Sequence, residues 1–373
     1  MKARYGIILL IPLLGGISLF SQPVWEKDLK EFLTDSAYAN ASVGIHLADA
    51  ASGETIFEFN SEQLRIPASV LKMVTTATAL ETLGPDYRFQ TEIGYEGKVS
   101  QSVLNGNIVI RGGGDPALGS EYFESHYSNP PFLRNWAQQL RFAGINEVKG
   151  DLILDTSIYD SEKIPDTWIW EDIGNYYGAA TSPLTVYDNL YRITFQSPPL
   201  PGEATTITSI FPKVPNLNIK NEVKSSNENR DLAYVFGSPL DGKRIIRGTI
   251  PKNRKAFTIK ASNPFPEKLL AADFTESLME KGIFISGKMQ TETVDPENFH
   301  CVYIQESPPL KKILKTINTE SINLFAEHLV KQIAYETEGK GTRKTGLNNI
   351  MQFWKNTNPF GGEIQMEDGS GLS

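Results

Sequence analysis

Pro67-Ala68-Ser69-Val70-Leu71-Lys72 is the one stretch of this chain in which a serine stands three residues before a lysine, in the pattern Ser-x-x-Lys. It opens a run of apolar and small residues that ends at Gly84-Pro85. Proline near the first turn and Gly-Pro at the end are typical helix boundaries, so we predict a helix over roughly residues 68–83. A spacing of three on a helix places the side chains of Ser69 and Lys72 on one face, one turn apart.

Such a pair can carry nucleophilic catalysis. A serine hydroxyl is a weak nucleophile until a neighbouring base takes its proton. Lysine can be that base only when its pKa falls from about 10.4 towards neutrality, and burial and the positive end of a helix both lower it. We expect the burial to come from the apolar neighbours Val70, Leu71, Met73 and Val74. The alternative is an ordinary helix start with a solvent-exposed lysine, because Ser-x-x-Lys is common by chance.

Ser321-Ile322-Asn323 is the second candidate element, and it precedes an amphipathic stretch at residues 324–333. A serine hydroxyl can pass a proton between a lysine and a leaving group, and an asparagine amide can both donate to and accept from a peptide. The alternative is a helix N-cap, because serine before an apolar periodic run also has that role. A competing match, Ser225-Ser226-Asn227, lies in a polar stretch, and we interpret it as a loop.

The order Ser-x-x-Lys, then Ser-x-Asn, resembles that of the penicillin-recognising serine enzymes. The interval from Ser69 to Ser321 is far longer than in class A β-lactamases. It resembles that of the D-alanyl-D-alanine carboxypeptidase/endopeptidases of the penicillin-binding protein 4 type (serine peptidase family S13), which carry a large insertion between the two motifs. Further stretches similar to this family are residues 112–116, 150–157, 321–329 and 368–373.

The resemblance implies a fold and a reaction. The implied fold is the α/β (α+β) β-lactamase/transpeptidase-like fold with a large β-rich insertion between the first and second catalytic motifs. The implied reaction is hydrolysis of the D-Ala-D-Ala end of peptidoglycan stem peptides, with Ser69 forming the acyl-enzyme and Lys72 as general base. Ser321 would relay a proton, and Asn323 would hold the substrate amide. No cofactor or metal is implied, and β-lactams would inhibit by acylating Ser69.

The resemblance also implies an acidic residue of the insertion that faces the side chain of the stem peptide. The matching position is Asp155, with Tyr159 as the aromatic residue nearby. The alternative is that Asp155 only begins a turn after a strand. Four further candidates are interpreted as structural. Trp168 and Trp170 are interpreted as core residues, and Glu327 and His328 as hydrogen-bonded or packing residues.

The third motif of the family is a Lys-Thr-Gly on an edge strand that follows the segment resembling residues 368–373. Lys344-Thr345-Gly346 has these residues, but it precedes Asp368, and residues 346–354 after it have a helical pattern. We therefore interpret it as unrelated to the motif and expect the chain to stop before the true strand. Because loss of one oxyanion-hole donor costs roughly 10²–10³ in rate, we expect these 373 residues alone to be nearly inactive.

Four segments are predicted along the chain. Residues 1–21 resemble an export signal, with a positive start and an apolar stretch too short to span a bilayer; an uncleaved anchor is the alternative. Residues 22–90 and 306–373 are predicted as two parts of the transpeptidase-like domain, and residues 91–305 as a β-rich insertion. Residues 42–49 and 55–59 alternate apolar and polar positions, which predicts a β-hairpin.

The composition excludes several classes of protein. With 36 Lys and Arg against 44 Asp and Glu, the formal net charge is −8, and no dense basic stretch offers a nucleic-acid surface. Cys301 is the one cysteine, so no intramolecular disulfide can form, and the four histidines lack the spacing of a zinc protease. We predict a protein of the periplasm or cell envelope, at most peripheral to the membrane, with peptidoglycan as its partner.

Two other functions stay open at this point. A β-lactamase or esterase could use the same scaffold, although the long insertion argues against it. A non-catalytic peptidoglycan-binding protein could have kept the fold, although the presence of both motifs argues against that. The rate of deacylation after penicillin would test the first alternative, and labelling of Ser69→Ala by penicillin would test the second.

Overall fold

The computed structural model describes residues 24–357 and 364–373. The chain divides into two compact units, Met1–Ile66 and Pro67–Ser373, which are described separately. Every candidate catalytic residue belongs to the second unit, and the predicted export segment at residues 1–21 lies outside the described residues. None of the helices within the described ranges has the combination of length and apolar character that crossing a bilayer requires.

The first unit contains a helix and a hairpin. Helix α1 (Val24–Thr34) is followed by the short 3-10 helix η1 (Ser36–Tyr38). Strands β1 (Ile45–Ala48) and β2 (Thr55–Phe59) pair antiparallel, which confirms the predicted hairpin. The Asp49 carboxylate stabilises the connecting turn because it accepts hydrogen bonds from backbone N–H groups of that turn.

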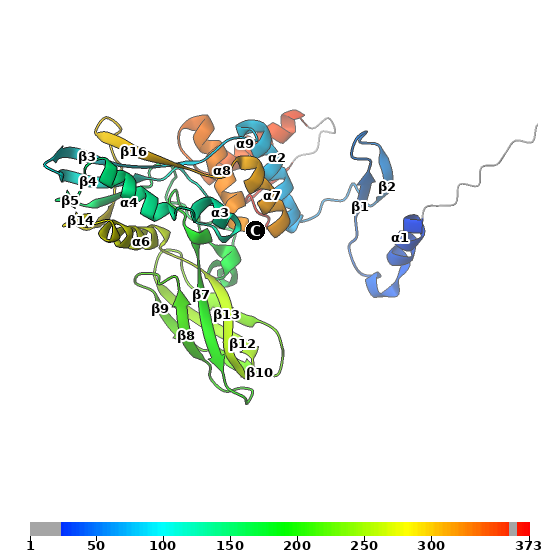
Figure 1. Ribbon diagram of the computed structural model, residues 1–373. Coiled ribbons are helices and arrows are strands. Elements are labelled where there is room, and N and C mark those ends of the chain that lie inside the picture. Colours follow the sequence, from blue (N-terminus) through cyan, green and yellow to red (C-terminus); the bar gives the residue numbers. More distant parts are fainter. Residues whose placement is uncertain (1–23, 358–363) are drawn as a thin grey trace, which may run out of the picture. The chain divides into compact units, whose positions relative to one another are not determined.

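The helices that carry or adjoin the catalytic candidates lie together with one further helix in one layer of the second unit (Figure 1). They are, in chain order, α2 (Lys72–Leu83), α7 (Leu310–Glu320), α8 (Asn323–Glu338) and α9 (Arg343–Thr357). Helix α2 contacts each of the other three. Helix α8 is buried on all sides over its first three turns, as expected for the central helix of a layer.

A mixed sheet lies beside this layer. Within the described residues its strands are β3 (Gln90–Ser100), β4 (Val103–Arg111), β5 (Glu147–Val148), β6 (Leu152–Asp155), β14 (Phe284–Ile285), β15 (Met289–Thr291) and β16 (Phe299–Glu306). The long β3–β4 hairpin pairs antiparallel with β16 on one side and parallel with β5 and β6 on the other. Helices α4 (Phe132–Phe142) and α6 (Pro266–Glu280) lie along it (Figure 1). One hydrophobic core joins the sheet to the helical layer, from Ile108 through Trp136 to Phe325.

A smaller β-module extends away from this body (Figure 1). Its strands are β7 (Leu190–Ser197), β8 (Thr206–Phe211), β9 (Asn218–Asn221), β10 (Lys224–Ser226), β11 (Leu232–Phe236), β12 (Lys243–Pro251) and β13 (Arg254–Ser262). It has its own core, which includes Tyr191, Phe195 and Ile246. The short helices α5 (Trp170–Ile173) and η4 (Tyr176–Gly178) lie between β6 and β7 in the sequence, and the short helix α3 (Glu124–Tyr127) lies between β4 and α4.

Strands are indeed frequent between the two motifs, but the main sheet shares its core with helices from both flanking segments. The predicted boundaries of the segments 22–90, 91–305 and 306–373 therefore stay predictions. One local prediction was wrong, because Ser225 and Ser226 lie in strand β10 and not in a loop. Backbone pairing with β12, in which Ser225 lies opposite Ile250, outweighs their polar character.

Candidate active site

Ser69 and Lys72 face each other at the start of α2. The 3-10 helix η2 (Ala68–Leu71) leads directly into α2, so the predicted helix over residues 68–83 begins with a tighter turn. Lys72 Nζ lies 3.1 Å from Ser69 Oγ, which is within hydrogen-bond distance. Ser69 is exposed, whereas Lys72 is 1% exposed. The hydroxyl is therefore open to a ligand, and the amine beside it is shielded from water.

Two of the four residues that were predicted to bury Lys72 lie on the surface. Val70 and Met73 are 65% and 62% exposed, because they lie on the outer face of the helix start. The Lys72 ammonium instead donates a 2.8 Å hydrogen bond to the backbone carbonyl of Ser370, near the other end of the described chain. Burial lowers the pKa of Lys72 to about 8, although nearby carboxylates act in the opposite direction. A lysine with a lowered pKa can accept a proton near neutral pH.

The segment that supplies this carbonyl, residues 368–373, folds around the buried carboxylate of Asp368. The carboxylate accepts hydrogen bonds from the backbone N–H groups of Ser370, Gly371, Leu372 and Ser373. The indole N–H of Trp168, a buried residue as predicted, donates to it at 2.8 Å. Although burial opposes the effect, these hydrogen bonds lower the pKa of Asp368. An ionised carboxylate thus anchors the segment that orients Lys72.

Glu327, on α8, holds the same segment from a second direction. Its buried carboxylate accepts a 3.0 Å hydrogen bond from the Gly369 N–H, which confirms the predicted structural role. Burial and the neighbouring Asp368 carboxylate raise the pKa of Glu327 to about 8. The Thr75 hydroxyl on α2 donates a 2.7 Å hydrogen bond to the Gly369 carbonyl. Helices α2 and α8 are therefore joined through Gly369, one residue from the carbonyl that holds Lys72.

Ser321 lies where α7 passes into α8. It ends α7 in a left-handed conformation, with φ 58 and ψ 44. Hydrogen bonds between the side chains of Thr76 on α2 and Asn318 on α7 hold this junction beside the helix that carries Lys72. Ile322 occupies the N-cap position of α8, so the alternative of a serine N-cap is wrong. Ser321 is exposed, and its hydroxyl has no hydrogen-bond partner among the described residues.

Asn323 connects this junction to the segment of α5 and η4, in which no site residue was predicted. Its Nδ2 donates a 2.9 Å hydrogen bond to the Tyr177 carbonyl of η4. The Tyr177 hydroxyl is hydrogen-bonded to the carboxylate of Asp172 in α5, and burial together with Asp172 raises the pKa of Tyr177. Trp170 is 57% exposed on the same short helix, so its prediction as a core residue was wrong. The available signal was an acidic pair, Glu171-Asp172, directly after an aromatic residue.

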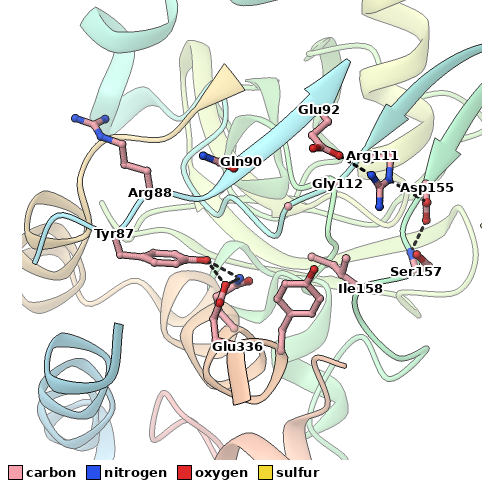
Figure 2. Close-up of a pocket in the computed structure, with 13 residues that line it drawn as sticks. Tyr87, Arg88, Gln90, Glu92, Arg111, Gly112, Asp155, Ser157, Ile158 and Glu336 are labelled. Carbon is pink, nitrogen blue, oxygen red and sulfur yellow. Dashed lines mark hydrogen bonds and ion pairs between the residues drawn. The ribbon is translucent and has the colours of Figure 1, made fainter. Parts of the chain in front are cut away.

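Asp155, predicted to bind substrate, lies in a different cavity. This cavity of about 560 Å³ is lined by the ends of β4 and β6 and by the C-terminal part of α8 (Figure 2). The backbone N–H groups of Ser157 and Val294 donate to the two carboxylate oxygens at 2.9 and 3.1 Å. Arg111 Nε lies 3.7 Å from Asp155 Oδ2. The carboxylate is therefore already engaged by its own surroundings.

Tyr159 is buried, and it contacts Gln332, one of the residues that line this cavity. Its hydroxyl donates a 3.0 Å hydrogen bond to Gln332 Oε1 on α8. Gln332 lies nine positions after Asn323, which is about 14 Å of helix at roughly 1.5 Å per residue. The structure thus brings Ser69 and Lys72 together and holds the Ser321–Asn323 junction beside their helix, but it separates Asp155 and Tyr159 from that junction.

Lys344-Thr345-Gly346 lies in the first turn of α9, which confirms that these residues are not on an edge strand. Gly346 packs against α8 so closely that a Cβ there would lie 1.9 Å from the Val330 carbonyl oxygen. This glycine is therefore explained by helix packing.

His328 has the structural role that was predicted. Its Nδ1–H donates a 3.0 Å hydrogen bond to the Gly114 carbonyl, and its Nε2 lies 2.8 Å from the Thr185 hydroxyl. Burial lowers the pKa of His328 to about 3, so the ring stays neutral. Within the described residues, no group of three or more His, Cys, Asp or Glu side chains is arranged to hold a metal ion.

Comparisons with known proteins place the chain among similar sequences and folds. A sequence model of the D-Ala-D-Ala carboxypeptidase 3 (S13) family matches residues 25–373. The chain is 28% identical over 359 residues to a D-alanyl-D-alanine carboxypeptidase of Actinomadura sp. (strain R39), covering 93% of this chain but only 64% of that protein. Among solved structures, penicillin binding protein 4 (dacB) from Haemophilus influenzae superposes with a TM-score of 0.74 at 23% identity, over 88% of this chain and 71% of that one. Its complex with a β-lactam superposes with a TM-score of 0.69 at 21% identity, over 88% and 69% of the two chains. The likeness confirms the predicted fold class.

Proposed function

The chain belongs to the D-Ala-D-Ala carboxypeptidase 3 (S13) family, and on this premise we propose that it is a serine-type D-Ala-D-Ala carboxypeptidase. Its substrate is the D-Ala-D-Ala end of a peptidoglycan stem peptide, and cross-linked stem peptides are candidate substrates for endopeptidase action. The observation that carries the proposal is an exposed Ser69 hydroxyl 3.1 Å from the amine of a buried lysine.

In the first step, Ser69 Oγ bonds to the carbonyl carbon of the penultimate D-Ala, and its proton passes to Lys72 Nζ. This transfer requires an unprotonated amine. A pKa of about 8 leaves roughly a tenth of Lys72 neutral at pH 7. The hydrogen bond to the Ser370 carbonyl holds Nζ in place, so the amine does not have to be ordered during the reaction.

In the second step, the bond to the terminal D-Ala breaks, and its nitrogen takes up a proton through the Ser321 hydroxyl. The free hydroxyl at the α7–α8 junction supports this relay. Asn323 holds the peptide, because its Nδ2 is occupied by the Tyr177 carbonyl and its Oδ1 is left to accept a substrate N–H. Water then adds to the acyl carbonyl and gives a proton to Lys72. Lys72 passes this proton to Ser69 Oγ as the ester bond breaks, which restores the serine hydroxyl and the neutral amine and releases the shortened peptide.

A carboxylate near Asn323 is suited to the side chain of the stem peptide. Sequence resemblance assigned this role to Asp155, whose oxygens are occupied by two backbone N–H groups and an ion pair. Asp172 is linked to Asn323 through Tyr177, and we infer that Asp172 is the acidic residue that meets the substrate. A stem-peptide residue with an ammonium group would be favoured there.

β-Lactams are proposed as inhibitors that acylate Ser69, since the β-lactam complex of the Haemophilus protein supports binding of this class. Peptidoglycan lies outside the cytoplasm, so the proposed function also requires export, for which the predicted signal at residues 1–21 is the supporting feature.

Labelled penicillin tests the function. The natural gene product should be labelled in proportion to its concentration, and Ser69→Ala should take up no label although it unfolds at the same temperature. The labelled enzyme should lose the penicilloyl group over hours, and rapid turnover would instead indicate a β-lactamase. Equal labelling of both proteins, or of neither, would contradict the proposal.

A further inference from the structure

A second large cavity lies between the β-module and the main body of the second unit. It has a volume of about 670 Å³ and is lined by residues near α3, α4 and α6 on one side and by β7 and the end of β8 on the other. Figure 1 shows how the β-module extends from this side of the body. The volume falls within the roughly 300–1,000 Å³ that small-molecule sites occupy, and junctions between modules are common places for such sites. Among the described residues, its walls include none of the Ser69 site.

Aromatic rings form much of the wall. Tyr127, Phe132 and Tyr187 line the side of the main body, and Phe132 contacts the other two rings edge-to-face at 5.7 and 6.2 Å. Phe211, at the end of β8, lines the opposite side and is 70% exposed. Phenyl and phenol faces attract cations and also pack against apolar ligand bodies. An exposed phenylalanine over such a wall is suited to cover a bound ring.

Carboxylates outnumber cations around the same space. Glu121, Glu124, Asp188, Asp273 and Glu276 line the cavity, against Arg192 and Lys213. Arg192 and Lys260 both pair with Glu121, so that carboxylate and Arg192 neutralise each other. Glu124 and Glu276 have no ion pair within the described residues. The cavity therefore presents a negative potential to any ligand.

Asp188 supplies a buried acceptor without a partner. It is 5% exposed, and its Oδ2 accepts a 3.2 Å hydrogen bond from the Glu121 N–H. Its carboxylate also faces the Ser120 hydroxyl, but Oδ1 is buried and has no hydrogen-bond partner. Burial raises the pKa of Asp188 to about 6, so the group is still mostly ionised above neutral pH. An unpaired buried carboxylate oxygen is unfavourable, and a ligand that donates a hydrogen bond to it removes this penalty.

We propose that this cavity is a binding site for a small organic cation, a primary ammonium carried on an aromatic body. The ammonium binds between Asp188 and Glu276, and the ring lies between Phe132 or Tyr187 and Phe211. A neutral ligand of the same shape keeps the ring contacts but leaves Asp188 Oδ1 without a cationic partner. A carboxylate of the same shape is repelled. The proposal is independent of the chemistry at Ser69.

Three probes of nearly equal shape separate the contributions: phenethylamine, 2-phenylethanol and phenylacetate. Saturation-transfer NMR titrations on the full chain at about pH 7.5 keep Asp188 ionised, given its pKa of about 6, and phenethylamine charged. We expect phenethylamine to bind at least tenfold more tightly than 2-phenylethanol, and phenylacetate to show no saturable binding. Equal affinity of all three probes, or no binding of phenethylamine, would overturn the proposal.

Variants locate the site. Asp188→Asn suits the left-handed backbone at φ 59, which asparagine tolerates, and it keeps an acceptor for the Glu121 N–H. It should weaken phenethylamine binding at least tenfold. Glu276→Gln, at an exposed position that does not endanger folding, should weaken it about threefold, and Phe211→Ala should weaken all ring-bearing probes that bind. Glu203→Gln removes one charge from a loop of the same module outside the cavity and should change nothing. If Glu276→Gln and Phe211→Ala bind phenethylamine as tightly as Glu203→Gln does, the cavity is not the site.

Discussion

Lys72 Nζ donates a 2.8 Å hydrogen bond to the backbone carbonyl of Ser370, which lies 298 positions later in the chain. The position of the amine therefore depends on the turn that Asp368 organises. Since Ser69 lies one turn before Lys72 on the same face, the reactivity of its hydroxyl depends on how residues 368–373 contact α2. This dependence can be tested without changing the side chain of Ser69, Lys72, Ser321 or Asn323.

Gly371→Ala should displace the turn. Gly371 has φ 75, and a Cβ there would lie 1.9 Å from the Ala68 carbonyl oxygen. The left-handed conformation alone costs an alanine about 1–2 kcal/mol, and the clash adds to this because backbone atoms must move. We expect a lower unfolding temperature and acylation of Ser69 by labelled penicillin that is at least tenfold slower.

Gly339→Ala is the matched control for this change. Gly339 ends α8 with φ 72, and no atom lies within 4 Å of the position that its Cβ would take. The left-handed conformation should lower the free energy of unfolding of Gly339→Ala by a similar amount, but the acylation rate should stay that of the wild type. If both variants acylate at the same reduced rate, the contact between residues 371 and 68 does not orient Lys72.

Glu327→Gln should change how stability depends on pH. The folded pKa of Glu327 is raised to about 8 by burial and by Asp368, against about 4.3 in an unfolded chain. Between these values the folded protein binds one proton more than the unfolded chain, so this group makes stability fall as pH rises. Glutamine mimics the protonated acid and has no such dependence. Urea unfolding at pH 5, 6, 7 and 8 should show a wild-type free energy of unfolding that declines relative to the variant, by a few kcal/mol in all.

Glu81→Gln serves as the control, because Glu81 is an exposed carboxylate on α2. Its stability should follow the wild-type curve at every pH. A Glu327→Gln curve parallel to the wild type between pH 5 and 8 would show that Glu327 is already ionised in the folded protein.

Acylation of Ser69 should follow the ionisation of Lys72, on the proposed function. With a pKa of about 8 for Lys72, the neutral fraction rises about tenfold per pH unit below that value and levels off above it. The second-order rate constant for labelled penicillin should show the same rise and plateau. Lys72→Arg should abolish acylation, because guanidinium keeps its proton in this range. A rate that does not change between pH 6 and 8 would exclude Lys72 as the base.

Much of the site could be predicted because its chemistry is local in sequence. Ser69 and Lys72 are three residues apart, and helix geometry alone brings them together. The helices and the β1–β2 hairpin could be predicted for the same reason, since periodicity and turn residues are local signals. The burial of Lys72 was assigned to neighbours in sequence, but two of them, Val70 and Met73, are exposed, and the contact with Ser370 depends on tertiary packing.

The same limit applies to the predicted substrate-binding residues. Asp155 follows a strand within a stretch that resembles the family, so sequence alone favoured it. Whether a carboxylate is free depends on its partners, and one of those of Asp155 is Val294, distant in sequence. The acidic pair Glu171-Asp172 after an aromatic residue is a local signal that does not show which groups lie near Asp172. Its proximity to the site depends on a side-chain hydrogen bond from Asn323 to a backbone carbonyl, which no periodicity encodes.

Replacing each aspartate with asparagine distinguishes the two candidates. Asp172→Asn removes a charge that is linked to Asn323 through Tyr177, so it should lower kcat/KM about tenfold for a D-Ala-D-Ala peptide whose preceding residue carries an ammonium group. This loss corresponds to about 1.4 kcal/mol, close to the lower end of the range of roughly 1.5–3 kcal/mol for a hydrogen bond to a charged group. The acetylated peptide, which lacks that charge, should be cleaved by Asp172→Asn and wild type at similar rates.

Asp155→Asn should give the opposite pattern. Its amide cannot accept at both oxygen positions from the Ser157 and Val294 N–H groups, so we expect a loss of about 1–3 kcal/mol in the free energy of unfolding. Selectivity between the free and acetylated peptides should stay at the wild-type ratio, because the cavity that Asp155 lines lies at the other end of α8. If Asp155→Asn and not Asp172→Asn abolished the preference for the free ammonium, the assignment of Asp172 would be wrong, and the substrate would have to reach the cavity of Figure 2.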